Sequence, residues 1–266
     1  MPAIVALVKH VPDTWSEKTL EADHTLNRDA VDNVIDEINE YSVEQALRLR
    51  DDNPDKGFKV VALTMGPESS DEALRKALAM GADEAIQVTD PALAGSDSLG
   101  TAWALSNAVN TIEDVQVIVM GNQSSDGSTG ALAGLLAEYR QWPALTAVKS
   151  VALAESGALT AVRDDARGKW ELEAALPAIV SVTDKAEKPR FPNFKGIMAA
   201  KKAEVIVKDL AGIGVNPANV GLAAATTQVV DASGRPPRTA GERIEGGSAE
   251  EAARQIADYL AAKNLI

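Results

Sequence analysis

The loop Gly121–Gly130, which reads GNQSSDGSTG, holds the residue types best suited to bind a phosphate. It follows an apolar run typical of a buried strand, Val115 to Met120, and precedes a helix that we expect to begin near Ser128. Unpaired N–H groups and the helix dipole make such a junction attractive to anions, and glycines let the backbone approach them. No Gly-Lys-Ser/Thr sequence follows, so the loop is not a Walker P-loop. Nucleotide binding and an ordinary turn with a helix cap both remain open from the spacing.

A second group of residues is predicted to lie near this loop. Leu7 and Met65 end two predicted strands, and Asn39 lies at a predicted helix start. The carboxyl ends of parallel strands meet at one edge of an open α/β sheet, where ligands bind. Backbone groups at these ends could pair with an adenine ring, and Asn39 could hold the ring or the ribose. The alternative is that Asn39 caps its helix and Met65 only packs.

Other reactive residues are few. Asp164 and Asp165 could form a general acid/base pair, but in a predicted hairpin we expect them to be solvated or in an interface. Trp15 and Tyr41 could stack on a planar cofactor or be structural. The chain has no cysteine and two histidines, which lack a metal-ligand spacing. We therefore predict no catalytic residue and no metal site.

The net charge of −13 disfavours nonspecific binding to nucleic acid or an anionic membrane. Between Lys185 and Glu204 the balance reverses, with six basic residues against two acidic ones. No apolar run approaches the roughly 18 residues of a membrane span, and the N-terminus resembles no secretory leader. We expect a cytoplasmic protein without membrane insertion.

Short apolar runs alternate with amphipathic helical stretches, which predicts a doubly wound, mostly parallel α/β sheet. The expected strands are Ala3–Val8, Lys59–Thr64, Glu84–Val88, Val115–Met120, Thr146–Leu153 and Ala178–Val182. Helix starts are expected at Asn39 or Ser42, at a Ser69–Glu72 capping box and at Ser96 or Asp97, and Gly81 suits a helix stop.

The last part of the chain differs in composition. Residues Thr160 to Ala175 predict a β-hairpin, and Pro189 and Pro192 are expected to break regular structure in the segment that follows. From Gly212 to Gly247 the chain is rich in Gly, Pro, Ala and Thr, which predicts an extended arm. A terminal helix follows, because Ala253, Ile256, Ala257 and Leu260 share one face.

Several motifs together resemble one family. These are VKHVPD, INEYSVEQALRLR, MGPESSDEALRKALAMGADEA, the Gly121 loop, LPAIVSVTD and, most specifically, KPRFPNFKGIMAAKK from Lys188 to Lys202. They occur in the order and spacing of the electron transfer flavoprotein β subunit, also called FixA-type, from Ile4 to Ile266.

The resemblance implies an adenine nucleotide alpha hydrolase-like, Rossmann-like domain over residues 1–208, with a partner-recognition segment at 184–205. Residues 209–266 would be an arm and helix that dock on an α subunit, forming a heterodimer. The α subunit would hold most of the FAD, and this chain would bury AMP and carry electrons without substrate chemistry of its own. Implied partners are flavin dehydrogenases of the acyl-CoA dehydrogenase type, as in fatty acid β-oxidation, and an acceptor of the ETF-quinone oxidoreductase type.

The resemblance also implies roles for particular residues. Tyr41 matches an aromatic position near the flavin, Phe194 an apolar anchor for dehydrogenases, and Asp164 an acidic position that restrains the FAD domain of the α subunit. The implied cofactor contacts are Leu7, Asn39, Glu40, Tyr41, Ser42, Met65, Gly121, Asn122, Gln123, Ser124, Ser125, Asp126, Gly127, Ser128, Thr129 and Gly130. The implied recognition residues are Pro189, Arg190, Phe191, Phe194, Ile197 and Met198, together with Asp164.

Two alternatives remain beside this reading. Electron-bifurcating members bind a second FAD in place of AMP and tend to read Asp-Gly-Asp-Thr in the loop, whereas this chain reads Asp-Gly-Ser-Thr at 126–129. A stand-alone adenine-nucleotide module of the universal stress protein type would share the sheet and loop but would need no partner. The arm and terminal helix favour a partnered protein.

Overall fold

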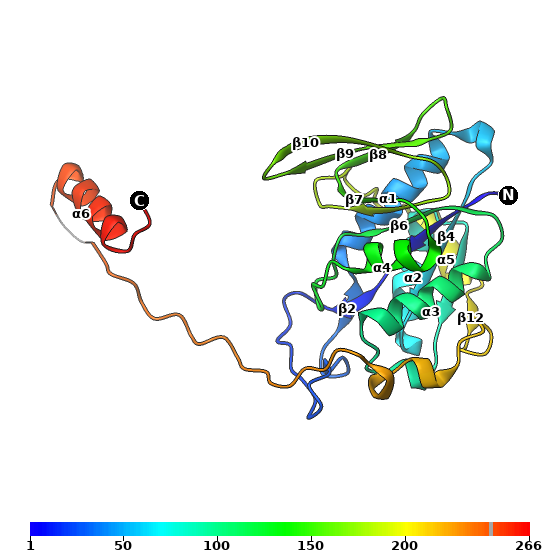
Figure 1. Cartoon of the computed structure of the whole chain (residues 1–266), viewed down its shortest axis with the longest axis horizontal. Coiled ribbons are helices and arrows are strands. Elements are labelled where there is room, and N and C mark those ends of the chain that lie inside the picture. The colour runs from blue at the N-terminus through cyan, green and yellow to red at the C-terminus, as the bar shows by residue number, and fades with distance from the viewer. Residues whose placement is uncertain (245–246) are drawn as a thin grey trace. The chain divides into compact units, whose positions relative to one another are not determined.

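Seven parallel strands form the main sheet in the computed structural model, which describes residues 1–244 and 247–266 (Figure 1). Their spatial order is β12-β5-β4-β1-β6-β11-β7. The strands are β1 (Ala3–Leu7), β4 (Lys59–Met65), β5 (Glu84–Val88), β6 (Val115–Gly121), β7 (Ala144–Val148), β11 (Ala178–Val182) and β12 (Ile206–Lys208). Strands β4, β5 and β12 follow one another outward on one side of β1, and β6, β11 and β7 lie on its other side. This winding in both directions from β1 confirms the predicted doubly wound parallel sheet.

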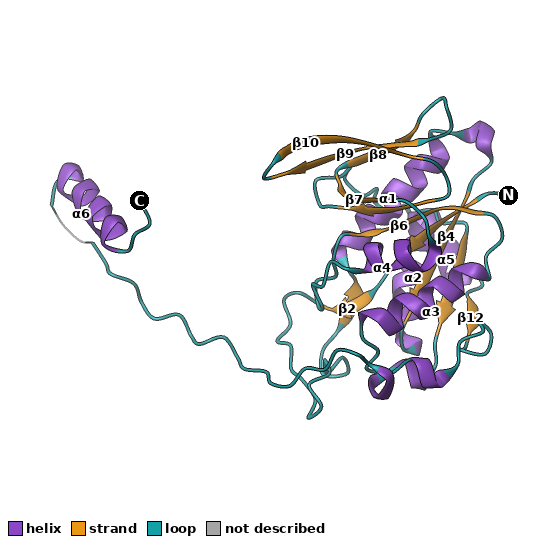
Figure 2. Cartoon of the chain, viewed as in Figure 1, coloured by secondary structure: helices purple, strands orange, loops and turns teal. Residues whose placement is uncertain are grey.

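Helices cover both faces of this sheet (Figure 2). Helices α1 (Glu37–Asp51), α2 (Asp71–Met80) and α5 (Phe194–Lys202) contribute to one apolar core, and α3 (Ser98–Asn110) and α4 (Leu132–Arg140) contribute to the other. Side chains alternate across a strand, so Ile4 and Ala6 of β1 lie in the first core while Val5 and Leu7 lie in the second. Burial on both faces explains why the strands read as continuous apolar runs.

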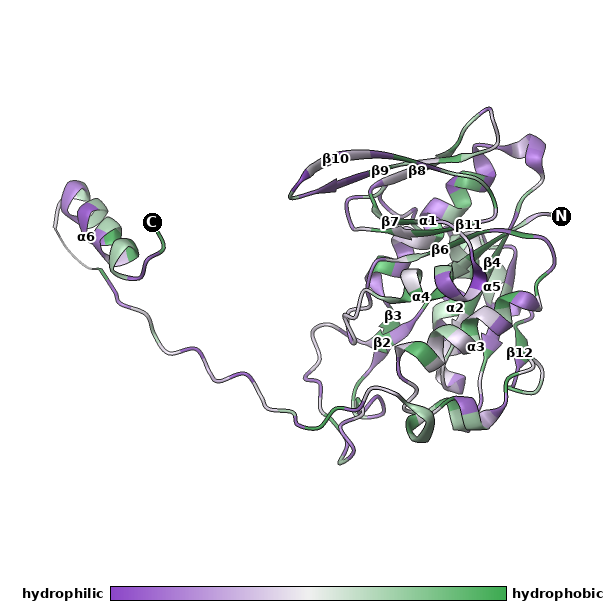
Figure 3. Cartoon of the chain, viewed as in Figure 1, coloured by the Kyte–Doolittle hydropathy of each residue, from purple (hydrophilic) through white to green (hydrophobic). Residues whose placement is uncertain are grey.

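Two smaller antiparallel sheets accompany the main one. They are β8 (Ser150–Leu153), β9 (Leu159–Asp165) and β10 (Gly168–Ala174), and the pair β2 (His10–Pro12) with β3 (Asn33–Ile35). The predicted hairpin is therefore confirmed, and Figure 3 shows its tip as hydrophilic. The single strand expected at Thr146–Leu153 is wrong, since β7 and β8 belong to different sheets. Ala147, with φ of 53°, lies near the end of β7 and breaks the regular extended backbone there.

Several expected helix ends also differ. α1 begins at Glu37, so Asn39 and Ser42 lie inside it, and α4 begins at Leu132, after two residues with left-handed φ. The expected Ser69–Glu72 capping box is absent, because a 3-10 turn (Glu68–Ser70) precedes α2 and the described residues provide no side-chain cap there. The predicted stop at Gly81 and start after Asp97 are confirmed. The remaining 3-10 turns are Pro54–Lys56, Pro91–Leu93, Pro217–Asn219 and Leu222–Ala224.

The segment after Pro189 is more regular than its prolines predicted. α5 starts immediately after Asn193, whose side chain accepts the N–H of Gly196 and caps the helix. Both prolines precede this cap, where they do not interrupt the helical hydrogen bonds.

The first compact unit extends to Val230, well beyond the start expected for the arm. Leu210, Ile213, Val215 and Val220 are buried in the core that contains α3 and α4. Apolar side chains spaced irregularly along loops give no periodic signal, which explains why composition alone indicated an arm from Gly212.

The second unit comprises Asp231–Ile266. Residues 231–244 have no helix or strand, and α6 (Ala249–Ala262) follows with a capping box formed by Ser248 and Glu251. Ile256 and Tyr259 form an apolar stripe on α6 and are 49% and 37% exposed. None of the described helices is long and apolar enough to cross a membrane.

Candidate functional site

A cavity of about 820 Å³ lies at the carboxyl edge of β1, β4 and β6. Ten of the expected cofactor residues line it, which are Leu7, Asn39, Met65, Gly121, Asn122, Gln123, Ser124, Gly127, Thr129 and Gly130. The structure therefore brings together the two groups of residues that the sequence singled out separately. Glu40, Tyr41, Ser42, Ser125, Asp126 and Ser128 do not line the cavity.

A buried carboxylate holds the Gly121–Gly130 loop against the rest of the site. The side chain of Asp126 is 1% exposed, and its oxygens lie 2.7 Å from Lys9 Nζ and 2.6 Å from Arg28 Nη2. Burial alone would raise the pKa of Asp126, but the charge of Lys9 and the hydrogen bonds from Lys9 and Arg28 outweigh it and hold that pKa well below its usual range. Asp126 thus supports the loop through its ion pairs with Lys9 and Arg28 and does not line the cavity.

A second carboxylate fixes the neighbouring turn. Asp36 Oδ2 accepts the N–H of Ser125 at 2.8 Å, which joins the start of α1 to the loop. Burial raises the pKa of Asp36, an effect that this hydrogen bond only partly offsets. Gly121 lies where the two segments meet, because an added Cβ would fall 2.5 Å from Ile38 Cγ2. A side chain at position 121 would therefore push α1 away from the loop.

The start of α4 carries unpaired donors beside the cavity. Within the described chain, the N–H groups of Thr129, Gly130 and Ala131 have no hydrogen-bond acceptor, and no side chain caps α4. Gly130 has φ of 63°, a left-handed conformation that glycine adopts without strain. Lys9 Nζ lies 3.3 Å from Ser124 Oγ, and Lys9 lines the same cavity as Thr129 and Gly130. Unpaired N–H groups, a helix dipole and an ammonium group together suit a phosphate.

Asn39 has a different role from a helix cap. Its Oδ1 accepts the N–H of Lys9 at 2.8 Å, which joins the first turn of α1 to the segment just after β1. Leu7 and Met65 add apolar side chains to the lining of the same cavity, to which Lys9 also contributes. The wall combines apolar surface with a few polar groups, the composition expected for a small-molecule site.

Several cavity residues were not anticipated. Lys9 and Arg28 complete the ion cluster, and two further segments line the cavity, Asp23–Thr25 and Gly95–Ser98, with Thr101. Residues 222 and 227–230 form another wall. The Gly-Ser-Asp-Ser sequence at 95–98 follows β5, so its position after a strand was a usable signal. The contribution of 222–230 has no local signal, because it depends on a long-range return of the chain.

Comparison with known proteins identifies the family of this chain. Residues 23–212 match the Electron transfer flavoprotein domain family. The chain is 47% identical over 273 residues to the electron transfer flavoprotein subunit beta of Mycobacterium tuberculosis, covering 100% of both chains. It is 31% identical to the subunit beta of Megasphaera elsdenii, covering 99% of both. It is 30% identical to the caffeyl-CoA reductase-Etf complex subunit CarD of Acetobacterium woodii, covering 99% of both.

The chain belongs to the electron transfer flavoprotein β-subunit family. Members of this family are electron carrier subunits.

In this β-subunit family member, the expected recognition segment presents apolar side chains to solvent. Phe191 and Phe194 are 95% and 80% exposed, and Ile197 and Met198 are each 40% exposed. Phe194 is the first residue of α5, so the expectation that prolines hold it on a non-helical segment is wrong. Its exposure shows that it does not fill the core of the domain. Pro189 is half-buried and precedes the exposed stretch.

Arg190 anchors this segment to α1. Its guanidinium lies 2.7 Å from Glu44 Oε2 and 2.8 Å from Asp51 Oδ2. The hydrogen bond to Glu44 raises the pKa of Arg190 further, although burial opposes this shift. The side chain of Glu44 is only 7% exposed, so the Arg190–Glu44 ion pair attaches the start of the segment to α1. Arg190 therefore anchors the segment, and the apolar side chains of the segment form its exposed part.

Asp164 and the aromatic candidates lie away from the cavity. Asp164 forms an ion pair with Lys149 in the three-stranded sheet. Asp165 lies at the hairpin turn, 3.7 Å from Arg163, so the two carboxylates do not form an acid/base pair. Tyr41, within α1, packs against the core, and Trp15 is 95% exposed.

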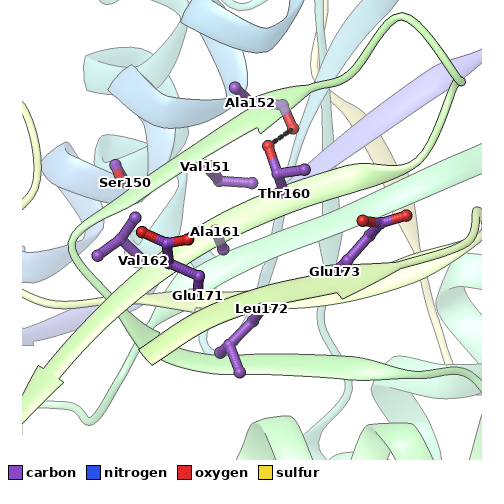
Figure 4. A pocket seen from close by; sticks show the side chains of 9 residues that line it. All are labelled: Ser150, Val151, Ala152, Thr160, Ala161, Val162, Glu171, Leu172 and Glu173. Carbon is purple, nitrogen blue, oxygen red and sulfur yellow. Dashed lines mark hydrogen bonds between the residues drawn. The ribbon is translucent and has the colours of Figure 1, made fainter. Parts of the chain in front are cut away.

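A second hollow, of about 320 Å³, lies on the β8-β9-β10 sheet (Figure 4). Val151, Ala161 and Leu172 are among its apolar lining residues, and Glu171 and Glu173 contribute carboxylates. It has neither a glycine loop nor a helix N-terminus, so it does not share the features that suit the larger cavity to phosphate.

Proposed function

We propose that this chain is the β subunit of a heterodimeric electron transfer flavoprotein that binds AMP in the cavity at the carboxyl edge of β1, β4 and β6. FAD would be held mainly by the α subunit. Electrons would pass from flavin dehydrogenases of the acyl-CoA dehydrogenase type, as in fatty acid β-oxidation, to an acceptor of the ETF-quinone oxidoreductase type. The unpaired N–H groups at the start of α4, two of which belong to residues that line a cavity with a partly apolar wall, are the observation that carries the AMP assignment.

The charges around the cavity support a phosphate as the anionic part of the ligand. Lys9 remains 41% exposed while paired with Asp126, so its ammonium can still approach a ligand. The buried Asp126 fixes the loop in place, which lowers the ordering cost of binding. The adenine would lie toward Leu7, Asn39 and Met65, where apolar side chains and strand-end backbone groups are available.

The exposed apolar side chains of residues 184–205 support a docking role for this segment. Phe194 and Phe191 have the exposure and size of binding hot spots, and Arg190 supports them from within the chain. The arm and α6, residues 231–266, would dock on the α subunit through the apolar stripe that includes Ile256 and Tyr259. Asp164 would restrain the FAD domain by exchanging its intramolecular partner, Lys149, for a basic residue of the α subunit.

The test is the nucleotide content of the heterodimer purified after co-expression with its α subunit. Mass spectrometry of the denatured complex should find one AMP and one FAD per heterodimer. Two FAD and no AMP would reassign the chain to the bifurcating type, and failure to co-purify with a flavin-containing chain would favour the stand-alone nucleotide module.

A matched pair of glycine variants tests the location of AMP. Gly130→Val should lose AMP, because valine strains the left-handed backbone whose N–H groups would bind the phosphate. Gly157→Val imposes the same kind of strain, with φ of 85°, at a hairpin turn away from the cavity, and should retain AMP. Equal AMP content in the two variants would remove the loop from the proposed site.

A further inference from the structure

Residues 222–230, here named the strap, run along one side of the nucleotide cavity. Leu222 N–H donates to Ala94 O at 3.0 Å, and the preceding N–H, of Gly221, donates to Ser96 Oγ at 2.8 Å. Both acceptors belong to the loop that leads into α3. The strap is therefore attached by its beginning to a segment more than 100 residues earlier in the sequence.

Asp97 holds the next part of the strap. Its Oδ2 accepts hydrogen bonds from Thr226 N–H at 2.8 Å, from Thr226 Oγ1 at 2.7 Å and from Thr227 N–H at 3.1 Å. Its Oδ1 accepts the N–H of Gly100 at 2.9 Å and so caps α3. Burial would raise the pKa of Asp97, but these hydrogen bonds outweigh it and lower the pKa. One ionised carboxylate thus gathers four donors, three of them from the strap.

The remainder of the strap faces the cavity. Leu222 and residues 227–230 all line it. Val229 and Val230 are 57% and 89% exposed although they are apolar, so a ligand in the cavity would remove apolar surface from water by covering them. The arm begins directly after the strap, at Asp231.

We propose that Asp97 is a positioning residue for the nucleotide, because it holds the strap as a wall of the cavity. Since the wall and the ligand contact each other, each stabilises the ordered state of the other. Nucleotide binding therefore fixes the root of the C-terminal arm. This inference rests on the proposed AMP site and assigns to it a carboxylate that does not itself contact the ligand.

The test compares Asp97→Asn with the wild type in the full-length chain. Asparagine is as good a helix cap as aspartate, so it preserves the bond to Gly100, but its amide group places a donor against the donors of Thr226 and Thr227. AMP affinity, measured by calorimetry, should fall by about tenfold or more. Asp209→Asn changes a carboxylate that caps an exposed turn outside the cavity and should leave the affinity unchanged.

Amide hydrogen exchange provides a readout that a purely structural role of Asp97 would not change. In the wild type, AMP should slow exchange at residues 222–230, and in Asp97→Asn this AMP-dependent protection should be lost while α3 stays protected. Thr226→Val, which removes one donor without touching the α3 cap, should weaken AMP binding about threefold.

The outcomes are separable. If the wild type binds AMP but Asp97→Asn and Thr226→Val bind it equally well, the positioning role is overturned while the proposed AMP site stands. If the wild type binds no AMP, the proposed site itself fails, and the positioning role fails with it.

Discussion

Replacement of Asp126 by asparagine tests how the Gly121–Gly130 loop is held. The substitution keeps the size of a side chain that is 1% exposed and removes the charge that Lys9 and Arg28 neutralise at 2.7 and 2.6 Å. An exposed ion pair contributes at most about 1 kcal/mol, whereas breaking a fully buried pair costs about 3 to 5 kcal/mol. The Lys9 and Arg28 side chains are 41% and 32% exposed, so water can solvate them after the change. We therefore expect the free energy of unfolding to fall by about 2 kcal/mol, between these limits.

The assay is urea unfolding of the full-length chain at pH 7, followed by circular dichroism. A matched control is Asp55→Asn, which removes a carboxylate 3.4 Å from Lys56 where both side chains are largely exposed, and it should not move the unfolding midpoint. If Asp126→Asn leaves the midpoint as unchanged as the control does, the ion cluster does not hold the loop and the reasoning is refuted.

The same cluster predicts the acid limb of stability. The pKa of Asp126 lies below its unfolded value of about 3.9, so its contribution is complete above that pH and is lost as pH falls toward the folded pKa. Below pH 4 the wild type should lose stability more steeply than Asp126→Asn, and the two curves should converge. Asp36 affects stability in the opposite direction as the pH falls. Burial raises its pKa, so folding favours its protonated form, which stabilises the fold at low pH. Parallel curves below pH 4 would contradict the assignment to Asp126.

Three further substitutions have defined outcomes. Gly121→Ala should lower the free energy of unfolding by about 1 to 3 kcal/mol, because the added Cβ would lie 2.5 Å from Ile38. The control Gly134→Ala has no described atom within 4 Å of the added Cβ and should not lower the stability. Equal melting temperatures of the two variants would show that the clash with Ile38 does not occur. Phe194→Ala should leave the melting temperature and nucleotide content unchanged and raise the half-saturation concentration for the dehydrogenase, and early melting with normal kinetics would disprove its docking role. Glu44→Gln should lower the free energy of unfolding by about 2 kcal/mol, because it weakens the paired support of the recognition segment, and an unchanged urea midpoint would show that this support is dispensable.

The sequence predicted much of the fold because the signals were local. The strands Glu84–Val88 and Ala178–Val182 were predicted at their observed bounds, since a short apolar run bounded by polar or turn residues is sufficient to mark a buried strand. Helix starts were harder. The side chains that seemed to be caps, Asn39 and Ser69, were not used as caps, since Asn39 instead bonds to Lys9 across 30 residues of sequence.

The candidate site shows the same division. Residue types and order pointed to the loop Gly121–Gly130 and the strand ends near it as a candidate site, and the family resemblance pointed to the segment that contains Phe194. These features depend on neighbours in the sequence and on the rule that parallel strands end at one edge. The family resemblance depends on such local motifs, and the comparison with known proteins confirms it.

Only the tertiary structure decided which charged groups are supports and which are available to a ligand. Arg190, implied as a recognition residue, pairs with the buried Glu44, and Asp126, implied as a cofactor contact, is buried in ion pairs with Lys9 and Arg28. The role of a charged group depends on burial and on partners that come from distant parts of the chain, and neither is encoded in its immediate neighbours. For the same reason, residues 222–230 read as an arm and fold back as a wall of the cavity.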